Sequence, residues 1–82
     1  TKQGQIYYET KIHWNGDLLV GRYENEIEAA IAYNKAASTL LRKGYLKDYP
    51  VNYIEELSDS EYRSRYQVVD ISDKIKVLKS LL

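Results

Sequence analysis

The dipeptide Asn15-Gly16 lies between residues 5–14, in which apolar and polar residues alternate, and the mostly apolar stretch of residues 18–23, which returns as a second strand. Alternation with a period of two is typical of a half-buried strand, and Asn-Gly is the pair that best tolerates the positive φ angles of a type I′ turn. The sequence therefore predicts a β-hairpin. One side of its first strand carries Ile6, Tyr8, Thr10, Ile12 and Trp14, and the other side carries Tyr7, Glu9, Lys11 and His13.

Helix signals follow the hairpin directly. Asn25 can cap a helix, and Glu28 three positions later completes a pattern like a capping box. Gly44 is placed to end this helix, which we expect from about residue 26 to residue 43. Its alanines are short enough to let the helix axis approach a sheet closely. The stripe that should pack on the sheet consists of Ala29, Ala30, Tyr33, Ala36, Ala37, Leu40 and Leu41, and it should face Tyr8, Ile12, Leu18 and Val20.

The second half of the chain is less regular. Residues 45–57 are apolar enough to lie back over the seam between helix and sheet, and Ser58 with Glu61 predicts the start of a short helix. Ser72 or Asp73 should cap a last helix, which would be marginal on its own. We therefore expect it to dock, either on residues 45–57 or, as an amphipathic helix, on a partner chain or a second copy. Its apolar face contains Ile71, Ile75, Leu78 and Leu82.

Together these elements predict an α+β fold, in which a small antiparallel β-sheet packs on one long α-helix. The length of 82 residues allows one small domain with an appended helix. We expect a hairpin-plus-helix domain at residues 1–57 and a helical C-terminal extension at residues 58–82.

Composition limits the classes of function. Twelve basic residues balance twelve acidic ones, so the chain has no excess of positive charge for a strong nonspecific grip on nucleic acid. It has no apolar run of 18 residues, which argues against a membrane span, and it has no cysteine, which excludes thiolate metal sites and fits an intracellular protein. The nine tyrosines can border a core or present a flat, hydrogen-bonding surface to a partner.

Catalysis and metal binding find little support in the sequence. His13 is the single histidine, and no motif supplies it with a nucleophile and an orienting acid. It is either an exposed strand histidine or a contact to nucleic acid. No set of acidic residues has the spacing of a calcium loop. We therefore expect a protein that is not an enzyme and that uses neither a metal nor another cofactor.

A hairpin followed by an alanine-striped helix resembles the APETALA-two/ethylene-response-factor DNA-binding domain, which is known from plant transcription factors and from phage and bacterial HNH homing endonucleases. The resemblance covers about residues 4–53. It is carried by Val20-Gly21-Arg22-Tyr23, by residues 24–37, by Gly44 and by Val51-Asn52-Tyr53. It implies that Asn34 and Asn52 tie the returning segment to the helix. It also implies a three-stranded sheet whose open face enters the DNA major groove.

The chain departs from the family pattern in two places. The first family strand would precede residue 4, where only three residues remain, so the chain is either an excised piece or has a shorter or absent first strand. The expected outward face also carries no arginine, the usual reader of guanine. That face consists of Tyr7, Glu9, Lys11, His13, Asp17 and Leu19. With a basic residue at the entry and one near the end of the second strand, the expected nucleic-acid contacts are Lys2, Tyr7, Glu9, Lys11, His13 and Arg22.

The sequence thus favours a nucleic-acid-binding module, acting on DNA within a larger regulatory or endonuclease-type protein. Such a protein would be intracellular, in the nucleus for a eukaryotic transcription regulator and otherwise in the cytoplasm or an organelle. The alternative is a structural, protein-interaction or RNA-contacting module of a ribonucleoprotein assembly. In that case a secondary basic tail would contact RNA phosphates through Arg63, Arg65, Lys74, Lys76 and Lys79.

Overall fold

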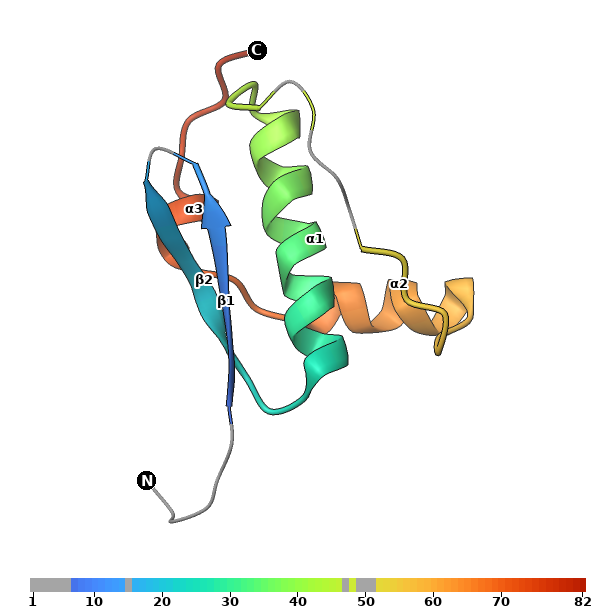
Figure 1. The fold of residues 1–82 in the computed structure, drawn as a ribbon. Helices are drawn as coiled ribbons and strands as arrows, with labels where there is room; N and C mark the ends of the chain where they lie inside the picture. The colour runs from blue at the N-terminus through green and yellow to red at the C-terminus, as the bar shows by residue number, and fades with distance from the viewer. Residues whose placement is uncertain (1–6, 15, 47, 49–51) are drawn as a thin grey trace.

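The computed structural model describes residues 7–14, 16–46, 48 and 52–82. Within these residues the chain forms β1 (Tyr8–His13), β2 (Asp17–Tyr23), α1 (Glu26–Arg42), α2 (Asp59–Val68) and α3 (Asp73–Lys76). The two strands form an antiparallel sheet, and α1 packs along one face of it (Figure 1). The predicted α+β class is confirmed. A strand before residue 4 would lie outside the described residues.

The hairpin contains one irregularity that changes its side-chain pattern. Thr10 lies opposite Gly21, but the next residue, Lys11, lies opposite Leu19. Val20 is therefore an extra residue on β2, which is the definition of a β-bulge. Because side chains alternate with a period of two, an extra residue exchanges the two faces for everything that follows it.

Gly21 and Tyr23 both follow the bulge, and the Tyr23 ring occupies the space that a side chain at position 21 would need. Tyr23 is buried, and its hydroxyl donates a hydrogen bond to the Asp70 carbonyl oxygen at 2.6 Å. A Cβ at position 21 would lie only 2.8 Å from Cζ of the Tyr23 ring, so this position leaves no room for a side chain. Tyr8, which lies opposite Tyr23, is 40% exposed, and the prediction that it belongs to the core is wrong. The Tyr23 ring is the one that is buried at this end of the sheet.

Helix α1 begins and ends close to the predicted residues. The Asn25 side chain accepts a hydrogen bond from the Glu28 backbone N–H at 2.8 Å, and Gly44 follows the last turn with a φ of 89°. The buried stripe is wider than predicted, because α1 contacts α2 and α3 as well as both strands. Ile31 and Ala32, which were not part of the predicted stripe, are fully buried. Four residues of that stripe are only half-buried, namely Ala29, Ala30, Tyr33 and Leu41.

The segment after α1 takes a different course from the predicted one. The Trp14 and Tyr45 rings meet edge to face, with centroids 5.2 Å apart, at the end of the hairpin. Residues 52–57 then lie on the side of α1 that faces away from the sheet, not over the seam (Figure 1). Asn34 holds them there, as the resemblance implied. Its side chain donates to the Asn52 carbonyl oxygen at 2.9 Å and accepts from the Asn52 N–H at 2.7 Å.

The capping box that begins α2 is confirmed, with Ser58 and Glu61 bonded to each other in both directions. The last helix is much shorter than predicted, since α3 ends at Lys76 and Leu78 to Leu82 are not helical. The Lys43 ammonium binds the carbonyl oxygens of Ile75, Lys76 and Leu78, and its own carbonyl oxygen accepts from the Leu81 N–H. These bonds turn the chain along the end of α1 instead of continuing a helix.

The C-terminal segment docks on its own chain, but at a different place from the one expected. Ile71 and Ile75 are buried in the same core as Ile12 and Val20. The Ser72 backbone N–H donates to the Val20 carbonyl oxygen at 2.9 Å, so residues 70–73 run beside β2. The hydrophobic core therefore contains residues from both halves of the sequence.

Candidate nucleic-acid interface

The bulge at Val20 decides which β2 side chains reach the open face of the sheet. Uninterrupted alternation would place Arg22 on the inward side with Val20. After the bulge, Arg22 lies directly opposite Glu9 on the outward side, and its side chain is 64% exposed. The prediction that this face carries no arginine is therefore wrong. The physical reason is the one-residue change of register.

Glu9 joins the two cations of this face. Its carboxylate lies 3.1 Å from Arg22 Nε and 3.4 Å from Lys11 Nζ. The hydrogen bonds from Arg22 and then from Lys11 lower the pKa of the Glu9 carboxyl group, because both favour its charged form. Lys11, Glu9 and Arg22 therefore form a positive–negative–positive row, which we call the sheet triad. All three side chains are accessible to solvent.

The remaining predicted contacts surround the sheet triad less closely. His13 lies near the turn, with its Nδ1 3.3 Å from a carboxylate oxygen of Asp17, and both side chains are exposed. Tyr7 and Leu19 are exposed as well. Lys2 lies outside the described residues. The structure thus brings Glu9, Lys11 and Arg22 together, with His13 further along the same strand.

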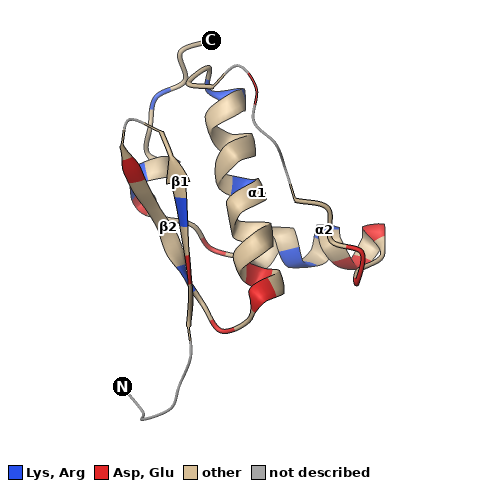
Figure 2. Cartoon of the chain, in the orientation of Figure 1, with Lys and Arg blue, Asp and Glu red and all other residues tan. Residues whose placement is uncertain are grey.

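The secondary basic tail is divided between separate elements. Arg63 and Arg65 lie on α2, whereas Lys74 and Lys76 lie on α3 and Lys79 follows it (Figure 2). Lys76 is neutralised by Asp70 at 2.8 Å and Asp73 at 3.1 Å, and these carboxylates raise its pKa through their hydrogen bonds. The Lys79 carbonyl oxygen accepts from the Tyr45 hydroxyl, which fixes the chain there. The five residues do not form one continuous cluster.

Two lysines, Lys35 and Lys43, have a structural function that the sequence did not predict. Lys35 Nζ donates to the carbonyl oxygens of Tyr66 and Val69 at the end of α2, and Lys43 does the same at the end of α3. A cation at the carboxyl end of a helix satisfies carbonyl groups that the helix leaves unpaired. Their partners lie more than 30 residues away in sequence, so no local pattern could have identified them.

Among the described residues, no three histidine, aspartate or glutamate side chains gather in a way that could hold a metal ion. None of the helices in the described part of the chain is long and apolar enough to cross a membrane. Comparison of the chain with protein-family models, with curated proteins and with solved structures finds no match in any of the three.

Proposed function

We propose that this protein is a non-enzymatic nucleic-acid-binding module that places the open face of its hairpin in the DNA major groove. The observation that carries this proposal is the sheet triad, an accessible row of two cations and one carboxylate on the face of the sheet away from α1. A two-stranded ribbon fits the width of the major groove. The resemblance to the APETALA-two-type domain supports the same orientation of the sheet.

Each member of the sheet triad offers a different contact. Arg22 can donate two hydrogen bonds to O6 and N7 of guanine, and Glu9 can accept from N4 of cytosine. Lys11 offers a point charge to a backbone phosphate, which positions the sheet without reading the sequence. The ion pairs within the triad are exposed, so exchanging them for contacts to DNA costs little.

The test is a titration of the whole chain with labelled duplex DNA at several salt concentrations. Because Lys11 neutralises a phosphate in this proposal, the logarithm of the binding constant should fall with the logarithm of the salt concentration at a slope of about −1 or steeper. Arg22→Ala should weaken binding, whereas Arg42→Ala, an exposed arginine at the end of α1, should not. Absence of binding at low salt would overturn the proposal.

A second function, a protein-interaction or RNA-contacting module within a ribonucleoprotein assembly, is favoured by one feature of the same face. Glu9 pairs with both cations, so the face is nearly neutral and suits a polar protein interface. Salt separates the two proposals, because affinity for a protein partner falls only mildly with salt and affinity for phosphates falls steeply. Competition between duplex DNA and single-stranded RNA then separates the two nucleic acids.

A further inference from the structure

The two outer edges of the hairpin differ in what lies beside them. The outer edge of β2 is occupied, because the Ser72 backbone N–H donates to the Val20 carbonyl oxygen at 2.9 Å and residues 70–73 run beside the strand. Within the described part of the chain, no backbone group outside the hairpin bonds to the backbone of β1. The edge of β1 is therefore the place where another strand can be added through main-chain hydrogen bonds.

The backbone groups that line this edge belong to Glu9 and Lys11. Alternate residues of a strand direct their N–H and C=O groups to opposite sides. The Trp14 N–H donates to the Gly16 carbonyl oxygen across the turn at 2.9 Å, so Thr10, four residues earlier, directs its backbone groups toward β2. The bulge is on β2 and leaves the alternation of β1 unchanged. Glu9 and Lys11, on either side of Thr10, consequently direct their backbone groups outward.

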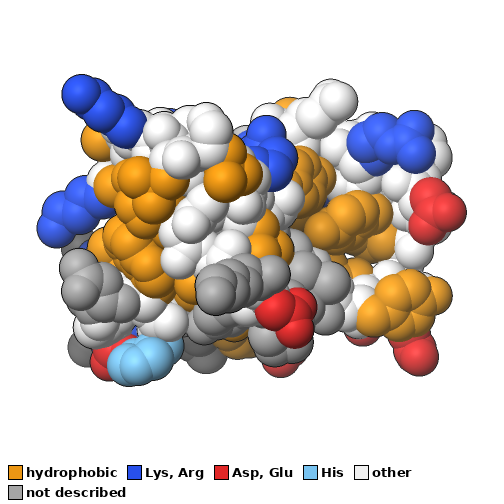
Figure 3. All heavy atoms as spheres, turned by 90° about the horizontal axis from the view of Figure 1, so that it is seen from above, with side chains coloured by type: hydrophobic (Ala, Val, Ile, Leu, Met, Phe, Trp, Pro, Cys, Tyr) orange, Lys and Arg blue, Asp and Glu red, His pale blue; other side chains and the backbone are white. Residues whose placement is uncertain are grey.

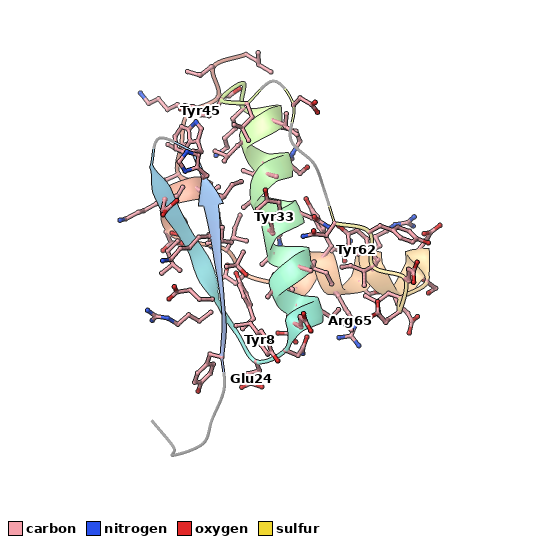
Figure 4. The ribbon with its side chains drawn as sticks, viewed as in Figure 1. Tyr8, Glu24, Tyr33, Tyr45, Tyr62 and Arg65 are labelled. Atoms are coloured by element: carbon pink, nitrogen blue, oxygen red, sulfur yellow. The ribbon has the colours of Figure 1, made fainter. Side chains whose placement is uncertain are left out.

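The β1 strand is accessible to solvent along its length. The side chains of Glu9 and Lys11, near its middle, are 39% and 54% exposed. Tyr8 lies at the start of the strand and is also exposed (Figure 4). The single histidine, His13, lies at the molecular surface at the other end (Figure 3). An added strand would thus meet side chains that are in contact with water.

The charges of β1 select one register in which two copies of the strand can pair. A two-fold axis makes such a contact antiparallel and self-complementary. Residues of one face must lie opposite residues of the same face, so the axis passes through a residue and not between two. An axis at Glu9 or at Lys11 would place two like charges directly opposite each other, which is destabilising. An axis at Thr10 places Glu9 of each copy opposite Lys11 of the other.

The rest of the molecule is compatible with this pairing. Helix α1 packs over both strands, so the α1 helices of two copies would lie about two strand spacings apart, or about 10 Å, a distance at which helices pack. Since residues 70–73 occupy the outer edge of β2, the assembly closes at two copies and does not continue into a fibre. Four strands also make a more stable sheet than an isolated hairpin.

We propose that a second copy of this chain pairs with the edge of β1, forming an antiparallel four-stranded sheet about a two-fold axis at Thr10. Glu9 of each copy would exchange two main-chain hydrogen bonds with Lys11 of the other, and their side chains would form an ion pair. The pairing uses the edge of the sheet and does not depend on the proposed binding of nucleic acid. Both open faces would lie on the same side of the dimer.

The test is analytical ultracentrifugation of the whole chain over a range of concentrations, without nucleic acid. The dimer fraction should increase with concentration, and no larger species should form. Lys11→Glu and Glu9→Lys each place like charges opposite each other and should weaken the dimer about fivefold or more. A mixture of the two variants should form a heterodimer about as stable as the unmodified dimer, because every lysine at position 9 or 11 then faces a glutamate.

A matched control and a second measurement locate the contact. Glu24→Lys makes the same change of charge at an exposed residue in the loop between β2 and α1 (Figure 4), and it should leave the dimer unchanged. Amide hydrogen exchange of the unmodified chain should slow at Glu9 and Lys11 as the concentration increases, because their N–H groups become bonded in the dimer. This measurement needs no substitution, so it tests the contact even where a charge reversal unfolds the hairpin. Circular dichroism melts verify that each variant is folded.

Four results would overturn the proposal. The first is a monomer mass at every concentration. The second is a dimer that both charge reversals leave unchanged, or that the mixture of variants does not restore, since its contact would lie elsewhere. The third is growth beyond two copies. The fourth is slow amide exchange of Glu9 and Lys11 in a monomer, which would show that another segment of the same chain pairs with β1.

Discussion

The Asn34 side chain binds both backbone groups of Asn52, with its amide on the carbonyl oxygen at 2.9 Å and its own oxygen 2.7 Å from the N–H. A single buried carboxamide thereby acts as a short strand would, satisfying a donor and an acceptor of a segment 18 residues away. It joins α1 to residues 52–57, which precede α2.

Replacing Asn34 by Ala should release this segment. The substitution removes three hydrogen bonds of a buried side chain, and we expect the free energy of unfolding to fall by about 1–3 kcal/mol. Urea unfolding followed by circular dichroism measures the loss. Ser38→Ala, one turn further along α1, is the control. An equal loss in the two variants would show that the bonds to Asn52 are not what stabilises this region.

Gly21→Ala should destabilise the hairpin by overpacking. The added methyl group would press on the Tyr23 ring, which is held in place by its bond to Asp70, and overpacking of this kind costs about 1–3 kcal/mol. Combining it with Tyr23→Leu removes the clashing ring, so the two losses should not add. Additive losses in a double-mutant cycle would contradict the proposed contact. Gly16→Ala is a useful comparison, since it has a φ of 90° but open space around it.

Stability should decrease at high pH because of Tyr23. Burial raises the pKa of its hydroxyl to about 12, with a smaller contribution from Asp70 and Glu28. The folded state therefore keeps its proton when the unfolded state, with a pKa near 10, has lost it. Stability from this group is fully present below pH about 10 and is lost as pH rises toward 12, by about 2–3 kcal/mol. Tyr23→Phe should be less stable at neutral pH and should show a smaller decrease over that range in thermal melts.

Lys43→Met should loosen the C-terminal segment. The Lys43 ammonium lies 2.8 Å from the Lys76 carbonyl oxygen and 2.6 Å from that of Leu78, and hydrogen bonds to a charged group contribute about 1.5–3 kcal/mol. We expect a lower melting temperature and faster amide exchange at Ile75. Lys74→Met removes an exposed lysine of α3 and should change neither. Unchanged exchange at Ile75 in Lys43→Met would refute this role.

Glu9→Gln tests the sheet triad. Removing the carboxylate charge frees Lys11 and Arg22 from their ion pairs, so affinity for duplex DNA should increase and the dependence on salt should become steeper. Contacts to cytosine through Glu9 would show as a loss of sequence preference in the same titration. Asp17→Asn, at the turn end of the same face, is the control. If the Glu9→Gln variant bound duplex DNA more weakly and without dependence on salt, the protein-interaction function would be favoured instead.

Several elements were predictable because their signals are local. Gly16 has a φ of 90° between the two strands, Asn25 with Glu28 begins α1, and Ser58 with Glu61 begins α2, whereas Asn15 lies outside the described residues. In each case the bonds that define the element join residues within four positions of one another, so neighbouring letters carry the information. Three of the expected contact residues, Glu9, Lys11 and Arg22, do lie together on the open face. Their function in binding nucleic acid stays a prediction.

Other features depended on contacts between distant parts of the chain. The bulge at Val20 moves Arg22 to the outward face, and the near-continuous apolar run before it contains no alternation that could reveal one extra residue. Lys43 ends α3 by binding carbonyl groups 32 to 35 positions away. The sequence by itself determined where strands and helices begin, through hydrogen bonds between near neighbours. Only the tertiary structure decided which face Arg22 occupies and where the last helix stops, because these depend on side chains that meet only after the chain has folded.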